Sequence, residues 1–238
     1  MKNFWVLFSF VLVLFSCSKT ENNTEISGTV KGLKKGTLYL QQIIDTTIVT
    51  IDSIPINGNG EFAFSLQLES PEVLYLFLRK TEGTEFSDRL DIFAAPGKIE
   101  VQTSLKNFEN DATVTGSVNH QKWIDYRKLM QRFNDRNLDL IKENFESQQT
   151  NNEERMSDIN QQMELLVRNK YLATVNFALN NKEYEIAPYL AISEIFDANI
   201  KYLDTIYTSL STAVKKSTYG KELEKFILER RNLEKARE

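Results

Sequence analysis

The stretch that decides the fold is ATVTGSVNHQKWIDYRKLMQRF, residues 112–133, because the spacing of its apolar residues changes partway along it. Up to Gly116, apolar and polar residues alternate, which is the period of a strand with one buried face. Beyond Gly116, apolar residues recur every three or four positions, as on one face of a helix, at Trp123, Tyr126, Met130 and Phe133. The sequence therefore predicts the α+β class, with a β domain over residues 24–116 and a helical domain over residues 117–238.

The pattern over residues 24–116 predicts an antiparallel β sandwich or barrel of about eight short strands. Residues 61–68, EFAFSLQL, alternate strictly, which predicts one wet face. Residues 73–78, VLYLFL, are continuously apolar, as in a central strand covered on both faces. Asn57–Gly60, NGNG, separates two strand-like runs and predicts a tight hairpin, since Asn and Gly accept positive φ.

The pattern over residues 117–238 predicts helices, of which the first two form a long antiparallel hairpin. Its two apolar stripes are separated by the polar break QQTNN, residues 148–152. Asn137 and Lys170 interrupt the stripes and could either fix the register of the helices or reach solvent, and we favour solvent. The stripes need a cover, which could be the β domain, the later helices or a second chain.

Three shorter helices are expected after the hairpin. Pro188 suits the first turn of one of them, and a second is expected over residues 202–214. Ser217 or Thr218 can cap the last helix. Residues 229–238, ERRNLEKARE, read as a solvated or frayed charged tail.

The N-terminus carries targeting information. Lys2 precedes the apolar run FWVLFSFVLVLF, residues 4–15, which is shorter than the roughly 20 residues of a membrane-spanning helix. Residues 14–17, LFSC, resemble a bacterial lipobox, in which the Cys is acylated and becomes the new N-terminus. We therefore expect a signal peptide at residues 1–16, lipidation of Cys17 and a tether over residues 17–23. The expected location is the bacterial cell envelope, as a lipoprotein on the periplasmic side or at the outer membrane, with the N-terminal lipid as the membrane contact.

The composition of the chain argues against several classes of partner and site. The chain of 238 residues has a formal net charge of −4, so no basic excess predicts a nucleic-acid partner. It contains one Cys and one His, which argues against a disulfide, a Cys/His zinc cluster and a redox Cys pair. We therefore expect no catalytic, cofactor-binding or metal-binding residues, and Cys17 is the only modification site predicted.

Several polar and aromatic residues are possible sites, but the sequence favours roles outside catalysis or binding for them. His120 lacks further metal ligands, so a structural or solvent role is expected. Asp52–Ser53 has no His partner placed by the sequence, and a local hydrogen bond is the better interpretation. Tyr39, Phe77 or Phe86 could form an exposed recognition face, although core packing is favoured.

Short signals along the whole mature chain carry a family resemblance. They include Ile26-x-Gly28-x-Val30, Asn59-Gly60-Glu61-Phe62-x-Phe64, Phe93-x-x-Pro96-Gly97, Ala187-Pro188-Tyr189 and Ser217-x-Tyr219-Gly220. In their order and spacing they resemble the N-terminal region of Bacteroidetes-type lipoproteins, which carry an uncharacterised β domain, a helical segment and a C-terminal thioredoxin-like or peroxiredoxin-like domain. The Trp-Cys-x-x-Cys site of that last domain has no counterpart in these 238 residues, so the resemblance transfers no redox activity and no site residue.

The leading expectation is a lipid-anchored envelope protein with a non-catalytic binding or scaffolding role. The alternative is an accessory subunit that docks a separately encoded thioredoxin-like oxidoreductase as its envelope partner. An enzyme with a novel cleft site is the third hypothesis.

Overall fold

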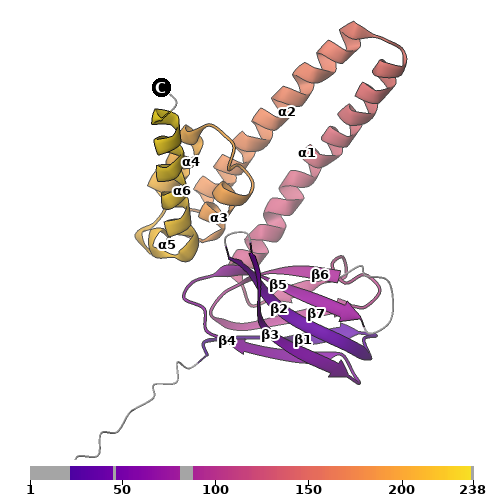
Figure 1. The fold of residues 1–238 in the computed structure, drawn as a ribbon, viewed down its shortest axis with the longest axis vertical. Helices are drawn as coiled ribbons and strands as arrows, with labels where there is room; N and C mark the ends of the chain where they lie inside the picture. Colours follow the sequence, from indigo (N-terminus) through magenta and orange to yellow (C-terminus); the bar gives the residue numbers. More distant parts are fainter. Residues whose placement is uncertain (1–21, 45–46, 81–87, 237–238) are drawn as a thin grey trace, which may run out of the picture.

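The computed structural model describes residues 22–44, 47–80 and 88–236. Cys17, the expected leader and Phe86 lie outside these ranges. Strands occupy the first part of the chain and helices the second (Figure 1). The strands are β1 (Thr24–Lys31), β2 (Lys35–Ile44), β3 (Thr47–Asn57), β4 (Glu61–Leu66), β5 (Glu72–Lys80), β6 (Asp88–Ala94), β7 (Gly97–Ser104) and β8 (Thr113–Thr115).

The strands form two four-stranded sheets, one in the order β4-β1-β7-β8 and the other in the order β3-β2-β5-β6. One apolar core joins the inner faces of both sheets, so the arrangement is a sandwich and the α+β prediction is confirmed. Its fully buried members include Ile26, Leu38, Leu76, Ile92 and Val101. The apolar run in β5 is central, as predicted, and its alternate residues Leu74, Leu76 and Leu78 face this core.

Five of the six strand pairs in the described ranges are antiparallel, as expected, and one pair is parallel. β1 and β7 run parallel, with Ile26 opposite Ile99 and Gly28 opposite Val101. Parallel neighbours need a crossover connection. Here the chain between β1 and β7 builds all four strands of the second sheet and passes through the first sheet once, at β4.

The tight hairpin predicted at Asn57–Gly60 is wrong. Its turn chemistry is present, because Gly58 and Gly60 both have positive φ. However, β3 belongs to the second sheet and β4 to the first, so the turn carries the chain between sheets. The turn is held by the β1–β2 connection, where Val30 N–H donates to Gly60 O and Gly58 N–H donates to Lys34 O.

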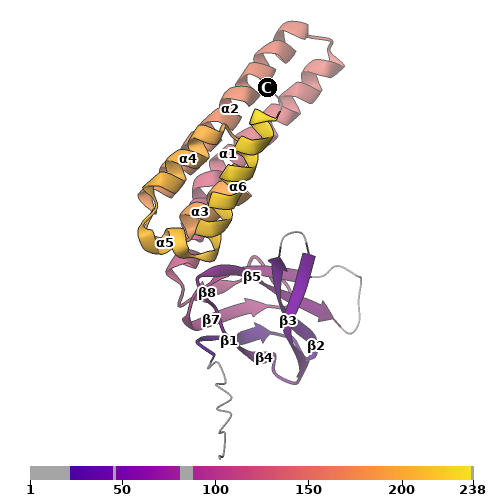
Figure 2. The ribbon, with the colours of Figure 1, turned by 60° about the vertical axis from the view of Figure 1, so that its left-hand side comes forward.

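The helices are α1 (Val118–Gln149), α2 (Glu153–Asn180), α3 (Ile186–Ser193), α4 (Ile200–Ser209), α5 (Thr212–Lys216) and α6 (Thr218–Lys235). The first two form the predicted hairpin, which projects away from the sandwich, while the remaining helices pack around its base (Figures 1 and 2). Ser117 and Asn152 cap α1 and α2 by accepting from backbone amides in the first turn.

Two expectations for the last helices need correction. The helix expected over residues 202–214 is two helices, because the chain is extended at Leu210 and Ser211 and Ser211 caps α5. The tail from residue 229 is helical rather than frayed, since α6 continues to Lys235, and most of its described residues are exposed, as the solvated alternative predicted. Arg230 holds it by donating to Phe196 O and Ala198 O, and Arg231 pairs with Asp204 at 2.6 Å. Ser217 caps α6, as predicted.

The helical hairpin is covered only near its base. There Trp123, Tyr126 and Met130 pack with residues of the β sandwich and of α3. Farther out, the side chains of Leu138, Ile141 and Phe145 are 64%, 50% and 61% exposed. Asn137 reaches solvent as expected, whereas Lys170 is half-buried and pairs with Glu194 at 3.7 Å. No helix within the described ranges combines the length and apolar character needed to span a bilayer.

Candidate functional site

Aromatic rings join the sandwich to the helices. Phe93 in β6 makes edge-to-face contacts with Trp123, Tyr189 and Tyr219, which come from α1, α3 and α6. The ring centroids lie 6.4, 5.3 and 5.8 Å from that of Phe93. Such pairs contribute beyond their buried area, so this cluster fixes the two parts of the chain against each other.

At this junction His120 provides a hydrogen-bond acceptor for an edge strand of the second sheet. Strand β6 is an edge strand, and the Phe93 amide donates to His120 Nδ1 at 3.2 Å instead of to another strand. Burial, together with the charge of the nearby Arg127, lowers the pKa of His120 to about 4. A neutral ring is the form that can accept at Nδ1. The structural role predicted for His120 is therefore its role in the fold.

Strands β2 and β5 separate at the other side of the junction. Their pairing stops at Gln41 and Tyr75, next to a register shift at Leu40 and Gln41 where β2 pairs with β3. Beyond that point the Val73 amide donates to the hydroxyl of Tyr219 at 2.9 Å. Burial raises the pKa of Tyr219 well above its ordinary value, so this hydroxyl stays protonated.

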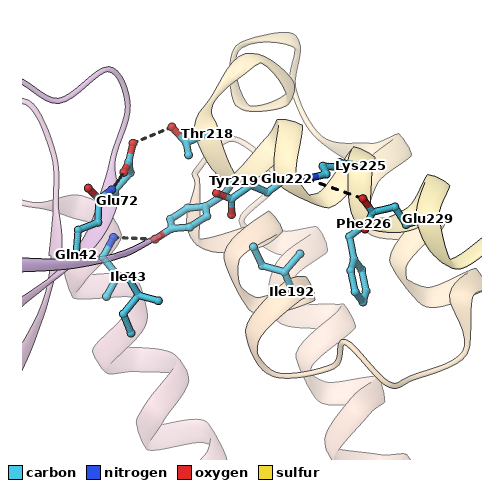
Figure 3. Close-up of a pocket in the computed structure, with 11 residues that line it drawn as sticks. Gln42, Ile43, Glu72, Ile192, Thr218, Tyr219, Glu222, Lys225, Phe226 and Glu229 are labelled. Carbon is cyan, nitrogen blue, oxygen red and sulfur yellow. Dashed lines mark hydrogen bonds and ion pairs between the residues drawn. The ribbon is translucent and has the colours of Figure 1, made fainter. Parts of the chain in front are cut away.

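Glu72 lies in the opening between the separated strands. It is only 8% exposed. One carboxylate oxygen accepts from the Thr218 hydroxyl at 2.7 Å, and the other accepts from the Gln42 side-chain amide. Ser70 adds a hydrogen bond to the Thr218 hydroxyl at 2.9 Å. The start of α6 is thus joined to the start of β5 by polar side chains (Figure 3).

Gln42, Glu72 and Thr218 line a cleft of about 280 Å³ between the β2–β3 ribbon and helices α3 and α6. The apolar part of its wall consists of Ile43, Val73, Ile192 and Phe226. Its charged members are Glu72, Glu222, Lys225 and Glu229, of which Lys225 and Glu229 pair at 3.9 Å (Figure 3). The cleft therefore joins an apolar wall to a predominantly acidic one, and it is our candidate site.

Of the described residues that the sequence offered as possible sites, only His120 belongs to this junction. Asp52 makes the expected local hydrogen bond, accepting from the Ser53 amide at 2.7 Å. Tyr39 and Phe77 form an edge-to-face pair, 5.9 Å between centroids, half-buried on the outer face of the second sheet. The favoured core packing is thus wrong for these two rings, because Leu38 and Leu78 take the inner positions.

A comparison with known protein families finds a match in the β part of the chain. Residues 24–123 match the family described as Domain of unknown function (DUF4369). The match contains all eight described strands and the start of α1, including Phe93, His120 and Trp123. No curated protein and no solved structure matches the chain. The match agrees with the expectation that the β part of the chain is an uncharacterised domain, and all of α6, including Tyr219, lies beyond the matched residues.

Sequence reasoning did not select Glu72, Thr218, Tyr219 or Phe226 as site residues. A weak signal existed, because Glu72 is a charged residue directly before the apolar run of β5. Tyr219 stood in the Ser217-x-Tyr219-Gly220 signal, but only as a mark of resemblance. Nothing in a linear sequence places α6 beside β5.

Proposed function

We propose that this protein is a lipid-anchored component of the bacterial cell envelope with a non-catalytic binding or scaffolding role. The N-terminal leader and Cys17 supply its membrane attachment in this proposal. The sandwich and helices supply a stiff platform that carries the cleft and the hairpin.

The observation that carries the proposal is the joint between the two parts of the chain. Phe93, His120 and Tyr219 connect three separate elements through ring contacts and backbone hydrogen bonds. A joint fixed in this way suits a protein that presents surfaces at a set distance and orientation. The apolar residues exposed on the distal part of the α1–α2 hairpin and on the β2–β3 ribbon are suited to contacts with a partner.

The anchoring half of the proposal is tested by replacing Cys17 with Ala in the full chain. We expect loss of metabolic palmitate labelling, an unprocessed leader and loss of the processed membrane form. The neighbouring change Ser18→Ala is the control and should leave labelling intact. Labelling that persists in the Cys17→Ala variant, or a processed wild-type chain recovered free of membranes, would overturn lipid anchoring.

The binding half is tested by placing a photoactivatable phenylalanine analogue at Phe226 in the cleft and at Leu138 on the hairpin. Irradiation of cells should give a discrete cross-linked species from at least one position. The exposed outer-face position Glu100, on the first sheet, is the control. If neither position gives more product than Glu100, the binding role is refuted.

A second candidate is the accessory subunit that docks a separate thioredoxin-like protein. The resemblance of Ser217-x-Tyr219-Gly220 to the segment leading into a redox domain supports it, because this segment lies against the β domain in the structure. Mass spectrometry of the cross-linked species decides between the candidates. A thioredoxin-fold partner favours the accessory role, and partners of other folds contradict it.

A further inference from the structure

We propose that the cleft between the β2–β3 ribbon and α6 receives an arginine or lysine side chain, presented by an extended segment of a partner protein. This inference rests on the proposed binding function and names the chemistry of its partner. It follows from the setting of Glu72, the apolar wall beside it and the free edge of the ribbon.

Glu72 is a buried carboxylate with neutral hydrogen-bond donors. Gln42 and Thr218 are the donors found for its oxygens, and none of the ion pairs between described residues includes Glu72. A carboxylate taken out of water is costly unless a cation balances it. Because Glu72 also lines the cleft, a cationic group entering from outside would supply that balance.

The rest of the lining fits the stem of a long basic side chain. Ile43, Ile192 and Phe226 provide apolar surface next to the carboxylates. Lys and Arg bury their aliphatic stems along such surfaces while the head group reaches polar partners, and an aromatic face adds attraction for the cation. The charged lining comprises three Glu and one Lys, so its formal charge is also complementary to a cation.

The ribbon beside the cleft offers backbone to an extended segment. Residues Gln42–Ile44 lie beyond the last β2–β5 pair, so in the described structure that side of β2 has no strand partner. Ile43 and Ile48, which pair across the ribbon, are 41% and 60% exposed. An added strand would pair with this edge and cover apolar side chains, which is how extended segments commonly dock on sheets.

The test is methyl NMR on the full processed chain in detergent, with labelled isoleucine methyl groups. Ile43 and Ile192 report on the cleft, and Ile159, buried in the hairpin, is the internal control. The probe is N-acetyl-arginine N-methylamide, and the comparison compound is the norleucine analogue, which keeps the stem without the charge. We expect saturable shifts of Ile43 and Ile192 alone, with affinity for the arginine compound about tenfold higher, the factor a charge-assisted pair supplies.

Variants and a longer probe separate the elements of the proposal. Glu72→Gln keeps the shape and should weaken the arginine compound about tenfold, without changing the norleucine compound. If Glu72→Gln does not fold, Glu229→Gln at the exposed rim should still weaken binding about twofold. N-acetyl-Val-Arg-Val N-methylamide should bind more tightly than the single residue and also shift Ile48.

Absence of saturable shifts, or equal affinity for the norleucine compound, would overturn the basic-side-chain site. Flanking valines that add nothing would show that the cleft binds a free cation and would overturn the extended segment. The cross-linking experiment at Leu138 and Phe226 is independent of these probes. Cross-links without probe binding would therefore refute this inference alone, whereas loss of both would refute the proposed function too.

Discussion

The amide of Val73 donates a hydrogen bond of 2.9 Å to the hydroxyl of Tyr219, which lies 146 residues farther along the chain. Val73 is near the start of β5, where β2 has already separated, and Tyr219 is in the first turn of α6. The last helix thus takes the place of a neighbouring strand for this backbone group. The bond ties the stability of the sandwich to the helices packed around the base of the hairpin.

Tyr219→Phe should destabilise the fold by about 1–2 kcal/mol, because it leaves the Val73 amide without its acceptor while keeping the ring contacts. The free energy of unfolding from urea titration measures this cost. Tyr171→Phe is the matched control, since the Tyr171 hydroxyl donates to Asp197 at an exposed position and should cost less than about 0.5 kcal/mol. Equal costs for the two variants would contradict the role assigned to Tyr219.

His120 should make the fold sensitive to acid. Its pKa in the folded chain is about 4, against 6.5 for the ordinary side chain, so the unfolded chain binds more protons between these values. The contribution of His120 to stability is therefore complete above pH 6.5 and is lost as the pH falls toward 4.

His120→Asn tests this dependence, because an amide oxygen can accept from Phe93 without titrating. Urea titrations at several pH values should show a smaller loss of stability on acidification for the variant than for the wild type. The difference should develop within the stated window. Parallel curves for the two proteins would show that His120 does not contribute.

Truncation of two adjacent residues on the hairpin should have very different effects on stability. Leu140 is 1% exposed, and Leu140→Ala should cost about 3 kcal/mol through the cavity it leaves. Ile141 is 50% exposed, and Ile141→Ala should change stability by less than about 0.5 kcal/mol. Thermal unfolding followed by circular dichroism measures both. A large cost at Ile141 would indicate that the distal face is covered in solution.

Gly28→Ala should disrupt the first sheet. A Cβ at this position would lie 1.8 Å from the carbonyl oxygen of Val101 in the parallel neighbour β7, so the two strands would have to move apart. We expect a loss of about 3 kcal/mol in the free energy of unfolding. Ser27→Ala is the control on the same strand and should stay within about 0.5 kcal/mol. A neutral Gly28→Ala variant would argue against the parallel β1–β7 register.

The sequence predicted the type of each element well because local spacing carries that information. The change of period at Gly116 separated strands from helices, and Ser217 was one of the two residues predicted to cap the last helix. Pairing could not be predicted in the same way. Asn57–Gly60 has the residues of a tight turn, but whether the following strand pairs with the previous one depends on which sheet leaves an edge open to it.

The sequence indicated a structural role for His120, which belongs to the joint between the two parts of the chain, but it did not predict the cleft. Glu72, Thr218 and Tyr219 indicate a site only when they are considered together. A buried carboxylate indicates a site only when its hydrogen-bond partners and its access to solvent are known. By itself the sequence determined the order of strands and helices, the charge, the scarcity of thiol and imidazole groups and the expected anchor at Cys17. The tertiary structure alone decided the sheet order, the joint and the cleft, because these depend on contacts between residues far apart in the chain.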